Sequence, residues 1–165
     1  MKQVSTFINF SRYRIVFLFV ILASVASCQK PNNHIKKTVP LKAEFTTVST
    51  ILQAGPPELD SIAGQGTGTP VGKSSFVAHA QFDASNKLTG IIVATAENGD
   101  QFFANIQGHD PEFDDATGAI TLHFQATIAG GTGKYAGATG SFAGIAHESI
   151  YNAAGSASWD GTITF

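Results

Sequence analysis

The sequence predicts an all-β fold in which eight antiparallel strands close into an up-and-down barrel. All 17 glycines lie between Gly55 and Gly161, so the 123 residues from Ala43 onward are about 14% glycine, which disfavours helices. In the same region apolar residues recur mostly at every second position, and turn residues separate segments rich in Thr, Val, Ile and Phe. Charged residues make up only 13% of the chain, so it can bury a core and fold.

Residues 1–27 have the features of an export signal. Lys2, Arg12 and Arg14 precede an apolar run of 12 residues from Ile15 to Ala26. A span across a bilayer needs roughly 20 apolar residues, so this run is too short to remain in a membrane. We therefore expect a signal peptide that is removed from the mature protein.

The end of the apolar run resembles a lipobox, the pattern that precedes the modified cysteine of bacterial lipoproteins. Val25, Ala26 and Ser27 stand before Cys28, which is the single cysteine of the chain, so no disulfide can form within it. The resemblance implies cleavage between Ser27 and Cys28 and attachment of acyl chains such as palmitate to Cys28. Two or three acyl chains hold a protein firmly on a membrane. An ordinary signal peptide with an incidental cysteine is the alternative.

Residues 28–42 are predicted to be a flexible basic tether with the lipidated cysteine at its start. They contain four lysines, two prolines and few apolar side chains. The lysines either contact anionic headgroups or are simply solvated. By the sorting pattern of enterobacterial lipoproteins, Gln29 favours the outer membrane, so the expected location is the bacterial cell envelope.

Residues 43–165 are expected to form the barrel domain, and the turn signals divide them into eight strands. Residues 84–86 join the third strand to the fourth, and Asn98-Gly99 joins the fourth to the fifth through a predicted type I′ turn. Ala153-Ala154 falls near the last turn. The predicted strands are residues 43–52, 59–67, 73–83, 87–97, 100–108, 118–129, 139–151 and 155–165.

The alternation of apolar and polar residues assigns the two faces of these strands. In the sixth strand, Ile120 to Ile128 alternate with polar residues, and in the eighth, Trp159 and Ile163 oppose Asp160 and Thr162. Closure into a barrel removes the exposed edges of such a sheet, whereas a two-sheet sandwich is the alternative architecture. An apolar cavity of at least roughly 300 Å³ with convergent polar groups would favour binding or catalysis, and a filled interior would favour a structural role.

The most distinctive segment of the domain is GGTGKYAGATGSF at residues 130–142. It resembles the glycine signature of bacterial proteins of the allene oxide cyclase barrel-like group and, more faintly, of plant dirigent proteins. Residues 64–73, 98–100 and 159–163 also look like that group. The resemblance implies an eight-stranded, calycin-like barrel, and it carries over no catalytic residue. The glycines expected to shape a loop by adopting positive φ are Gly130, Gly131, Gly133, Gly137 and Gly140.

This glycine segment does not match a phosphate-binding loop. Ile128 stands where the first glycine of such a loop belongs, and Tyr135 follows Lys134 where Ser or Thr is required. A dinucleotide-binding turn would need a helix after it, but residues 137–144 contain too many glycines to form one. No cofactor is predicted.

The histidines and acids do not form a recognisable catalytic or metal-binding motif. His79 and His123 fall on the polar sides of their strands, whereas His147 shares parity with Ile145 and is a weak candidate for an inward-facing ligand donor or general base. The acids of residues 109–115 lack the spacing of a calcium loop, and no GxSxG motif is present. We therefore predict no metal ligand and no catalytic residue.

The net charge of the predicted barrel domain narrows the possible functions of the protein. Residues 43–165 hold three lysines and all 12 acids, a net charge of 3 − 12 = −9, which argues against nucleic-acid binding. The sequence favours a non-enzymatic binding or interaction module held on a membrane through Cys28, with a small hydrophobic ligand as a further partner. The alternatives are a cyclase or isomerase acting on a hydrophobic substrate inside the barrel, which the family resemblance implies, and a purely structural envelope protein.

Overall fold

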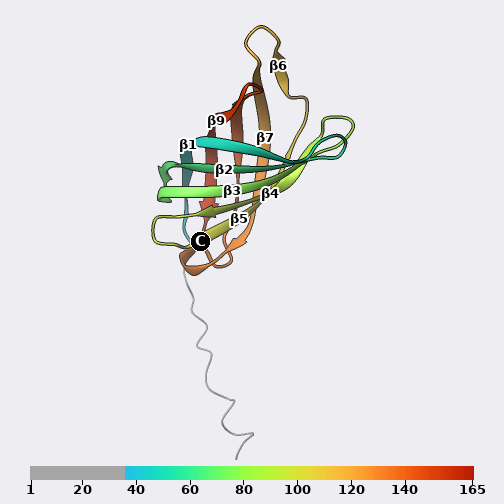
Figure 1. Cartoon of the computed structure of the whole chain (residues 1–165). Helices are drawn as coiled ribbons and strands as arrows, with labels where there is room; N and C mark the ends of the chain where they lie inside the picture. Colours follow the sequence, from blue (N-terminus) through green and yellow to red (C-terminus); the bar gives the residue numbers. More distant parts are fainter. Residues whose placement is uncertain (1–35) are drawn as a thin grey trace, which may run out of the picture. The chain divides into compact units, whose positions relative to one another are not determined.

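A computed structural model describes residues 36–165, which form one compact unit (Figure 1). The predicted signal peptide and Cys28 lie outside these residues. Within them no helix is long and apolar enough to cross a membrane. The elements are β1 (Thr38–Gln53), β2 (Glu58–Thr69), β3 (Gly72–Phe82), β4 (Leu88–Thr95), β5 (Gln101–Gly108), β6 (Glu112–Asp114), β7 (Ala119–Gly131), the 3-10 helix η1 (Gly133–Tyr135), β8 (Thr139–Ser149) and β9 (Asn152–Thr164).

Eight long strands close into an antiparallel barrel, as the sequence predicts. The strands are hydrogen-bonded in the order β5-β4-β3-β2-β1-β9-β8-β7, and β5 also pairs with β7 over Phe102–Gly108 and Phe124–Gly131, which completes the circle. Closure rules out the open two-sheet sandwich and leaves the eight strands without a free edge. The short strand β6, which the sequence analysis does not identify, pairs only with the start of β7.

The first strand begins earlier than predicted, at Thr38 rather than Ala43. Residues 38–42 were expected to belong to the tether, but they pair with the end of β9, and Leu41 is fully buried. Lys37 and Phe165 exchange backbone hydrogen bonds of 2.8 and 3.1 Å. The tether prediction is therefore wrong for residues 38–42. Val39 and Leu41 alternate with more exposed residues, and this alternation continues the inward face of β1.

Inward-facing positions alternate with more exposed ones along the eight long strands, as predicted for the strands now labelled β7 and β9. Two inward positions carry glycine for a steric reason. A Cβ at Gly64 would overlap the ring of Phe76, and a Cβ at Gly144 would overlap the ring of Phe124. Glycine on one strand therefore makes room for an aromatic ring, and this contributes to the high glycine content of an aromatic-rich core.

Two turns differ in detail from the prediction. In the turn between β4 and β5, Gly99 has φ of 84° but Asn98 does not have positive φ, and Gly99 N donates to Ala96 O at 2.9 Å. This is a type I turn followed by a left-handed glycine rather than a type I′ turn. The last turn lies at Ile150-Tyr151, and Ala153 and Ala154 already belong to β9.

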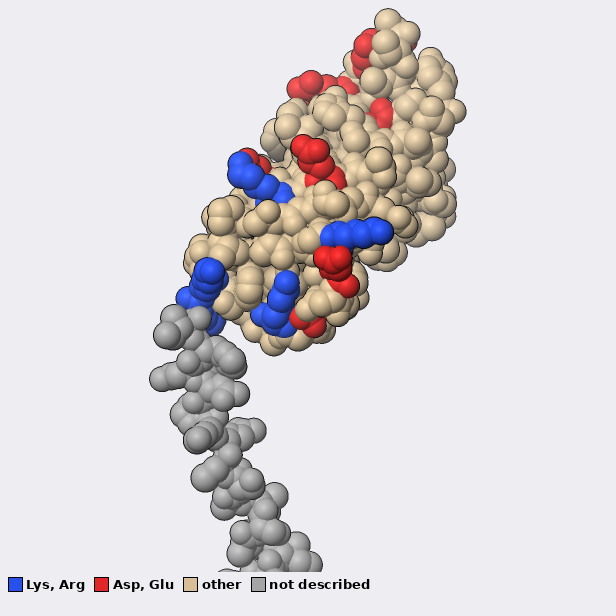
Figure 2. All heavy atoms as spheres, turned by 90° about the vertical axis from the view of Figure 1, so that its left-hand side faces the viewer, with Lys and Arg blue, Asp and Glu red and all other residues tan. Residues whose placement is uncertain are grey.

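Charges separate between the two ends of the barrel. Among residues 36–165, the end that contains Lys36 carries five lysines and four acids. The opposite end, where β8 turns into β9, carries eight acids and one lysine, Lys87. The upper end of the face in Figure 2 accordingly shows acidic side chains and no lysine. The eight acids of this second end are Glu58, Asp60, Asp83, Asp110, Glu112, Asp114, Asp115 and Glu148.

Candidate functional site

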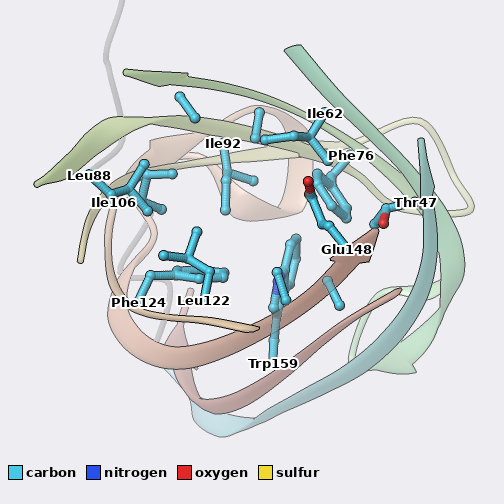
Figure 3. Close-up of a pocket in the computed structure, with 14 residues that line it drawn as sticks. Thr47, Ile62, Phe76, Leu88, Ile92, Ile106, Leu122, Phe124, Glu148 and Trp159 are labelled. Carbon is cyan, nitrogen blue, oxygen red and sulfur yellow. The ribbon is translucent and has the colours of Figure 1, made fainter. Parts of the chain in front are cut away.

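An apolar pocket lies inside the barrel near its acidic end (Figure 3). Its volume is about 40 Å³. One water molecule needs roughly 10–15 Å³ of such cavity volume, so the pocket has room for about three water-sized groups. It is lined by Thr47, Ile62, Phe76, Ala78, Ala80, Leu88, Ile92, Ile106, Leu122, Phe124, Ala146, Glu148, Ala157 and Trp159.

A cluster of aromatic rings packs around Trp159, which lines the pocket. The ring centroids of Phe45, Phe76 and Phe142 lie 4.5, 5.0 and 4.8 Å from that of Trp159. These side chains come from β1, β3, β8 and β9 and are at most 5% exposed. Because the rings fill the middle of the barrel, the cavity is far smaller than the roughly 300 Å³ of an ordinary ligand pocket.

The other end of the barrel is closed by the glycine-rich segment. Tyr135 in η1 is fully buried, and its ring lies 5.7 Å from Phe102 and 5.0 Å from Phe165. Gly130, Gly133, Gly137 and Gly140 all have positive φ, as expected for a loop-shaping role. The expectation is wrong for Gly131, which does not have positive φ. Glycine is required there because a Cβ would overlap the carbonyl oxygen of Gln101.

Polar groups are few in the pocket, and two of them lack partners. The Oγ1 atom of Thr47 and the Nε1 atom of Trp159 have no hydrogen-bond partner within residues 36–165, and these two residues are only 4% and 3% exposed. Buried polar atoms are almost always paired, so these two atoms are available to a polar group of a ligand or to a water. Ser74 Oγ and Tyr135 OH are likewise buried without a partner among residues 36–165, but they do not line this pocket.

Glu148 supplies an acidic group to the same pocket. It is partly buried at the end of β8, and the Ser49 hydroxyl of β1 donates a hydrogen bond of 2.8 Å to its Oε1. Figure 3 shows its carboxylate turned into the barrel, toward the side where Ile62 and Thr47 lie. An acidic side chain in an apolar wall is costly unless something pairs with it, so this position is unlike the rest of the core.

Asp60 lies two residues before Ile62 on the inward face of β2. Desolvation raises its pKa from 3.8 to about 6, and the neighbouring acids Glu58 and Glu148 contribute to the shift. Its Oδ1 atom is buried without a hydrogen-bond partner. The carboxyl group of Asp60 therefore loses its proton at a pH closer to neutral than an ordinary aspartate does.

The inward orientation predicted for His147 is wrong. Its side chain is exposed, and its Nδ1 shares a hydrogen bond of 3.1 Å with the Thr121 hydroxyl on the outer wall. In β8 the buried positions are those of Phe142 and Gly144, and this parity places Ala146 and Glu148 in the pocket. Counting from Phe142 instead of Ile145 would have identified Glu148 from the sequence.

The other sequence candidates lie outside the pocket. His79 and His123 are exposed, as predicted, and His109 is exposed with its Nδ1 2.8 Å from Asp110. Within residues 36–165 no group of three or more His, Cys, Asp or Glu side chains is arranged to hold a metal ion. Thr47, Asp60 and Glu148 were missed, and their signal was a polar residue at an inward position of a predicted strand.

A second, open hollow of about 630 Å³ lies on the outer wall. It is formed where β5 ends beside β7 and is bordered by the turn between β3 and β4. Most of its lining is polar and exposed, so it offers a shallow surface rather than an enclosed site. The lining residues are Ser85, Lys87, Gln107, Gly108, His109, Asp110, His123, Phe124 and Gln125.

Comparison with known proteins bears on the fold. No protein-family model matches the chain, and no curated protein matches it. Among solved structures, a pterocarpan synthase dirigent protein superimposes with a TM-score of 0.54 over 78% of this chain and 85% of that one, at 12% sequence identity. At this identity the likeness concerns architecture alone. The chain thus has a dirigent-like, eight-stranded β-barrel fold with a buried aromatic cluster.

Proposed function

We propose that this protein is a lipid-anchored binding module of the bacterial cell envelope, and that the acidic end of its barrel binds the apolar part of a small ligand. The single observation that carries the binding role is the pocket wall, where Thr47 and Trp159 keep unpartnered polar atoms beside an apolar surface. Because the pocket holds only about 40 Å³, a ligand inserts one end and leaves the rest at the rim.

The anchor rests on the sequence around Cys28. A short apolar run and three small or branched residues precede this cysteine, and a basic segment follows it. We infer cleavage between Ser27 and Cys28, acylation of Cys28 and retention at the outer membrane. Cys28→Ser should abolish labelling by radioactive palmitate and lipid-mediated membrane retention. It should leave either an unprocessed precursor or a soluble product.

The matched control for the anchor is Ser27→Gly, which keeps a small residue before the cysteine and should keep the label. Unchanged palmitate labelling in Cys28→Ser would contradict the anchor. Binding at the barrel end is a separate property of residues 36–165, so loss of the anchor would leave it to be judged by its own experiment.

Native ligand is the direct test of the binding role. The protein is purified from membranes of its own host, and small molecules released from it are identified by mass spectrometry. We expect one defined compound with an apolar portion, in near-stoichiometric amount. Its absence from repeated native preparations would favour the structural role, with which the filled middle of the barrel agrees.

Catalysis is a second candidate function, favoured by Asp60. A carboxyl group whose pKa is about 6 beside an apolar pocket is suited to proton transfer. The pterocarpan synthase dirigent protein of similar fold makes a cyclase or isomerase worth testing. The released compound, incubated with the protein in deuterated water, would gain deuterium at carbon if the protein catalyses proton transfer, and an unchanged mass would support binding alone.

A further inference from the structure

The acidic end of the barrel has an excess of negative charge, which favours a positively charged ligand. Eight acids and one lysine lie on the strand ends and turns there, whereas the other end is nearly balanced. Large exposed apolar side chains share the acidic end: Ile51, Leu52, Phe113, Ile150 and Tyr151 are between 61% and 73% exposed. Charge of one sign beside exposed apolar surface is complementary to a ligand that carries both an apolar body and the opposite charge.

The pocket adds acceptors within the acidic surface. Glu148 is in its wall, and the Ser49 hydroxyl donates a hydrogen bond of 2.8 Å to its Oε1. Thr47 Oγ1 in the same wall is a buried oxygen atom without a hydrogen-bond partner among residues 36–165. The same holds for Oδ1 of Asp60, which does not line the pocket but lies two residues before Ile62, which does. An ammonium group brings three donors and a positive charge, so it satisfies oxygen acceptors that neighbouring carboxylates cannot satisfy.

Aromatic rings in the pocket also favour a cation. Phe76 and Trp159 both line it, with centroids 5.0 Å apart. A cation near such ring faces is attracted by their negative electrostatic potential, and the attraction increases when water is excluded. An anionic ligand would meet the carboxylates instead and be repelled.

From these features we propose that the acidic end of the barrel is a binding site for an organic ammonium ion, with the alkyl part of the ligand in the apolar pocket and the ammonium group between Glu148, Asp60 and Thr47. The inference rests on the binding role proposed above and specifies the class of ligand. The small pocket volume of about 40 Å³ suits the end of an alkyl chain.

The experiment uses three probes with the same six-carbon body: hexylammonium, 1-hexanol and hexanoate. Trp159 is the single tryptophan of the chain and lines the pocket, so its fluorescence reports binding directly. For residues 29–165 at pH 7.5 and low salt, we expect hexylammonium to bind at least tenfold more tightly than 1-hexanol and hexanoate not to bind. Raising the salt to 0.5 M should weaken hexylammonium binding severalfold and leave 1-hexanol unchanged.

Glu148→Gln keeps the size of the side chain and its hydrogen bond from Ser49 but removes the charge. It should lower the affinity for hexylammonium to that for 1-hexanol, and a melting temperature no lower than that of the unaltered protein is the check on folding. Glu44→Gln is the matched control, because Glu44 is exposed on the outer wall of β1, and it should bind all three probes like the unaltered protein.

The outcomes separate the two proposals. If 1-hexanol binds as tightly as hexylammonium, or if Glu148→Gln keeps the preference, the ammonium site is overturned while apolar binding stands. If none of the probes binds, both proposals fail at this pocket.

Discussion

Thr47 and Glu148 are the polar residues of the mostly apolar pocket wall, and the free-energy cost of burying the Thr47 hydroxyl can be measured. A buried hydroxyl without a partner costs about 1–3 kcal/mol, and valine has nearly the same shape without the hydroxyl. Thr47→Val should therefore raise the free energy of unfolding by about 1 kcal/mol in urea denaturation. Thr50→Val, at an exposed position of the same strand, should change it by less than about 0.5 kcal/mol. A loss of stability in Thr47→Val would show that the hydroxyl has a partner.

The ionisation of Asp60 should make stability depend on pH. Its pKa is about 6 in the barrel and 3.8 ordinarily, so the folded state binds the proton more readily than the unfolded state. Ionised Asp60 thus destabilises the fold above about pH 6, and the penalty disappears as the pH falls toward about 4. Asp60→Asn should be more stable at pH 7.5 by on the order of 1 kcal/mol after allowance for solvent screening, and equally stable at pH 4.

Chemical denaturation of both proteins at several pH values measures this linkage. Glu44→Gln is the control for the removal of one acid from an acidic domain. Its stability relative to the unaltered protein should show no change that is confined to the range between about pH 4 and pH 6. A stability difference between Asp60→Asn and the unaltered protein that stays constant from pH 4 to pH 7.5 would mean that Asp60 titrates as it does in an unfolded chain.

At the level of elements, Asp100 connects two loops at the closed end of the barrel. Its carboxylate accepts hydrogen bonds from the backbone N of Lys134 at 3.0 Å and from Asn98 at 2.7 Å, and these bonds lower its pKa. Gly133 lies against this carboxylate, with φ of 53°, and a Cβ there would overlap it. Asp100 thus helps to hold the turn between β4 and β5 against the segment before β8, together with the hydrogen bonds of 2.9 and 2.7 Å between Gln101 and Thr132.

Gly133→Ala should disrupt this connection. The left-handed conformation costs a non-glycine residue about 1–2 kcal/mol, and displacement of Asp100 adds the loss of charged hydrogen bonds, for a total of about 3 kcal/mol. Gly137→Ala is the matched comparison, because Gly137 also has positive φ but open space around it, and it should cost only about 1 kcal/mol. Equal melting temperatures for the two variants would show that the contact with Asp100 adds no stability.

The strands were predictable because local chemistry determines them. Alternation and turn residues identify all eight long strands, with boundaries that differ by a few residues. The start of β1 was missed because Pro40 suggests a linker. Pro40 is tolerated since β1 pairs only with β9 there, and pairing with β2 begins at Lys42, so the missing N–H faces no partner strand.

The candidate site was less predictable than the fold because it depends on which strands meet. Thr47, Asp60 and Glu148 come from β1, β2 and β8, and each is a polar residue at an inward position. Alternation alone predicts those positions once one buried residue of each strand is fixed. It does not predict that aromatic rings from four strands fill the middle of the barrel and leave a small pocket beside them.

At the scale of the whole molecule, the barrel closes through residues far apart in the chain. The first and last strands, β1 and β9, are neighbours, with Thr38 opposite Thr164, and β5 pairs with β7. Each pairing brings together inward residues of the same core, including Leu41, Trp159 and Ile163, which are at most 3% exposed. The chain from Lys36 to Phe165 therefore contains every strand of the circle and a core of its own.

The stability of this circle should depend on where the N-terminus is placed. A chain beginning at Ala43, the start expected from the sequence, lacks buried Leu41 and five strand residues paired with β9. Loss of a buried leucine alone costs about 2–5 kcal/mol, so we expect it to be less stable than a chain beginning at Lys36 by at least about 3 kcal/mol, or roughly 10 °C in Tm. Differential scanning calorimetry of the two chains measures the difference.

The control is a chain that begins at Lys36 and carries Leu41→Ala, which keeps the backbone pairing with β9. It should show most of the loss of stability. Equal melting temperatures for the chains beginning at Lys36 and Ala43 would mean that residues 38–42 contribute nothing to the barrel and belong to the tether after all.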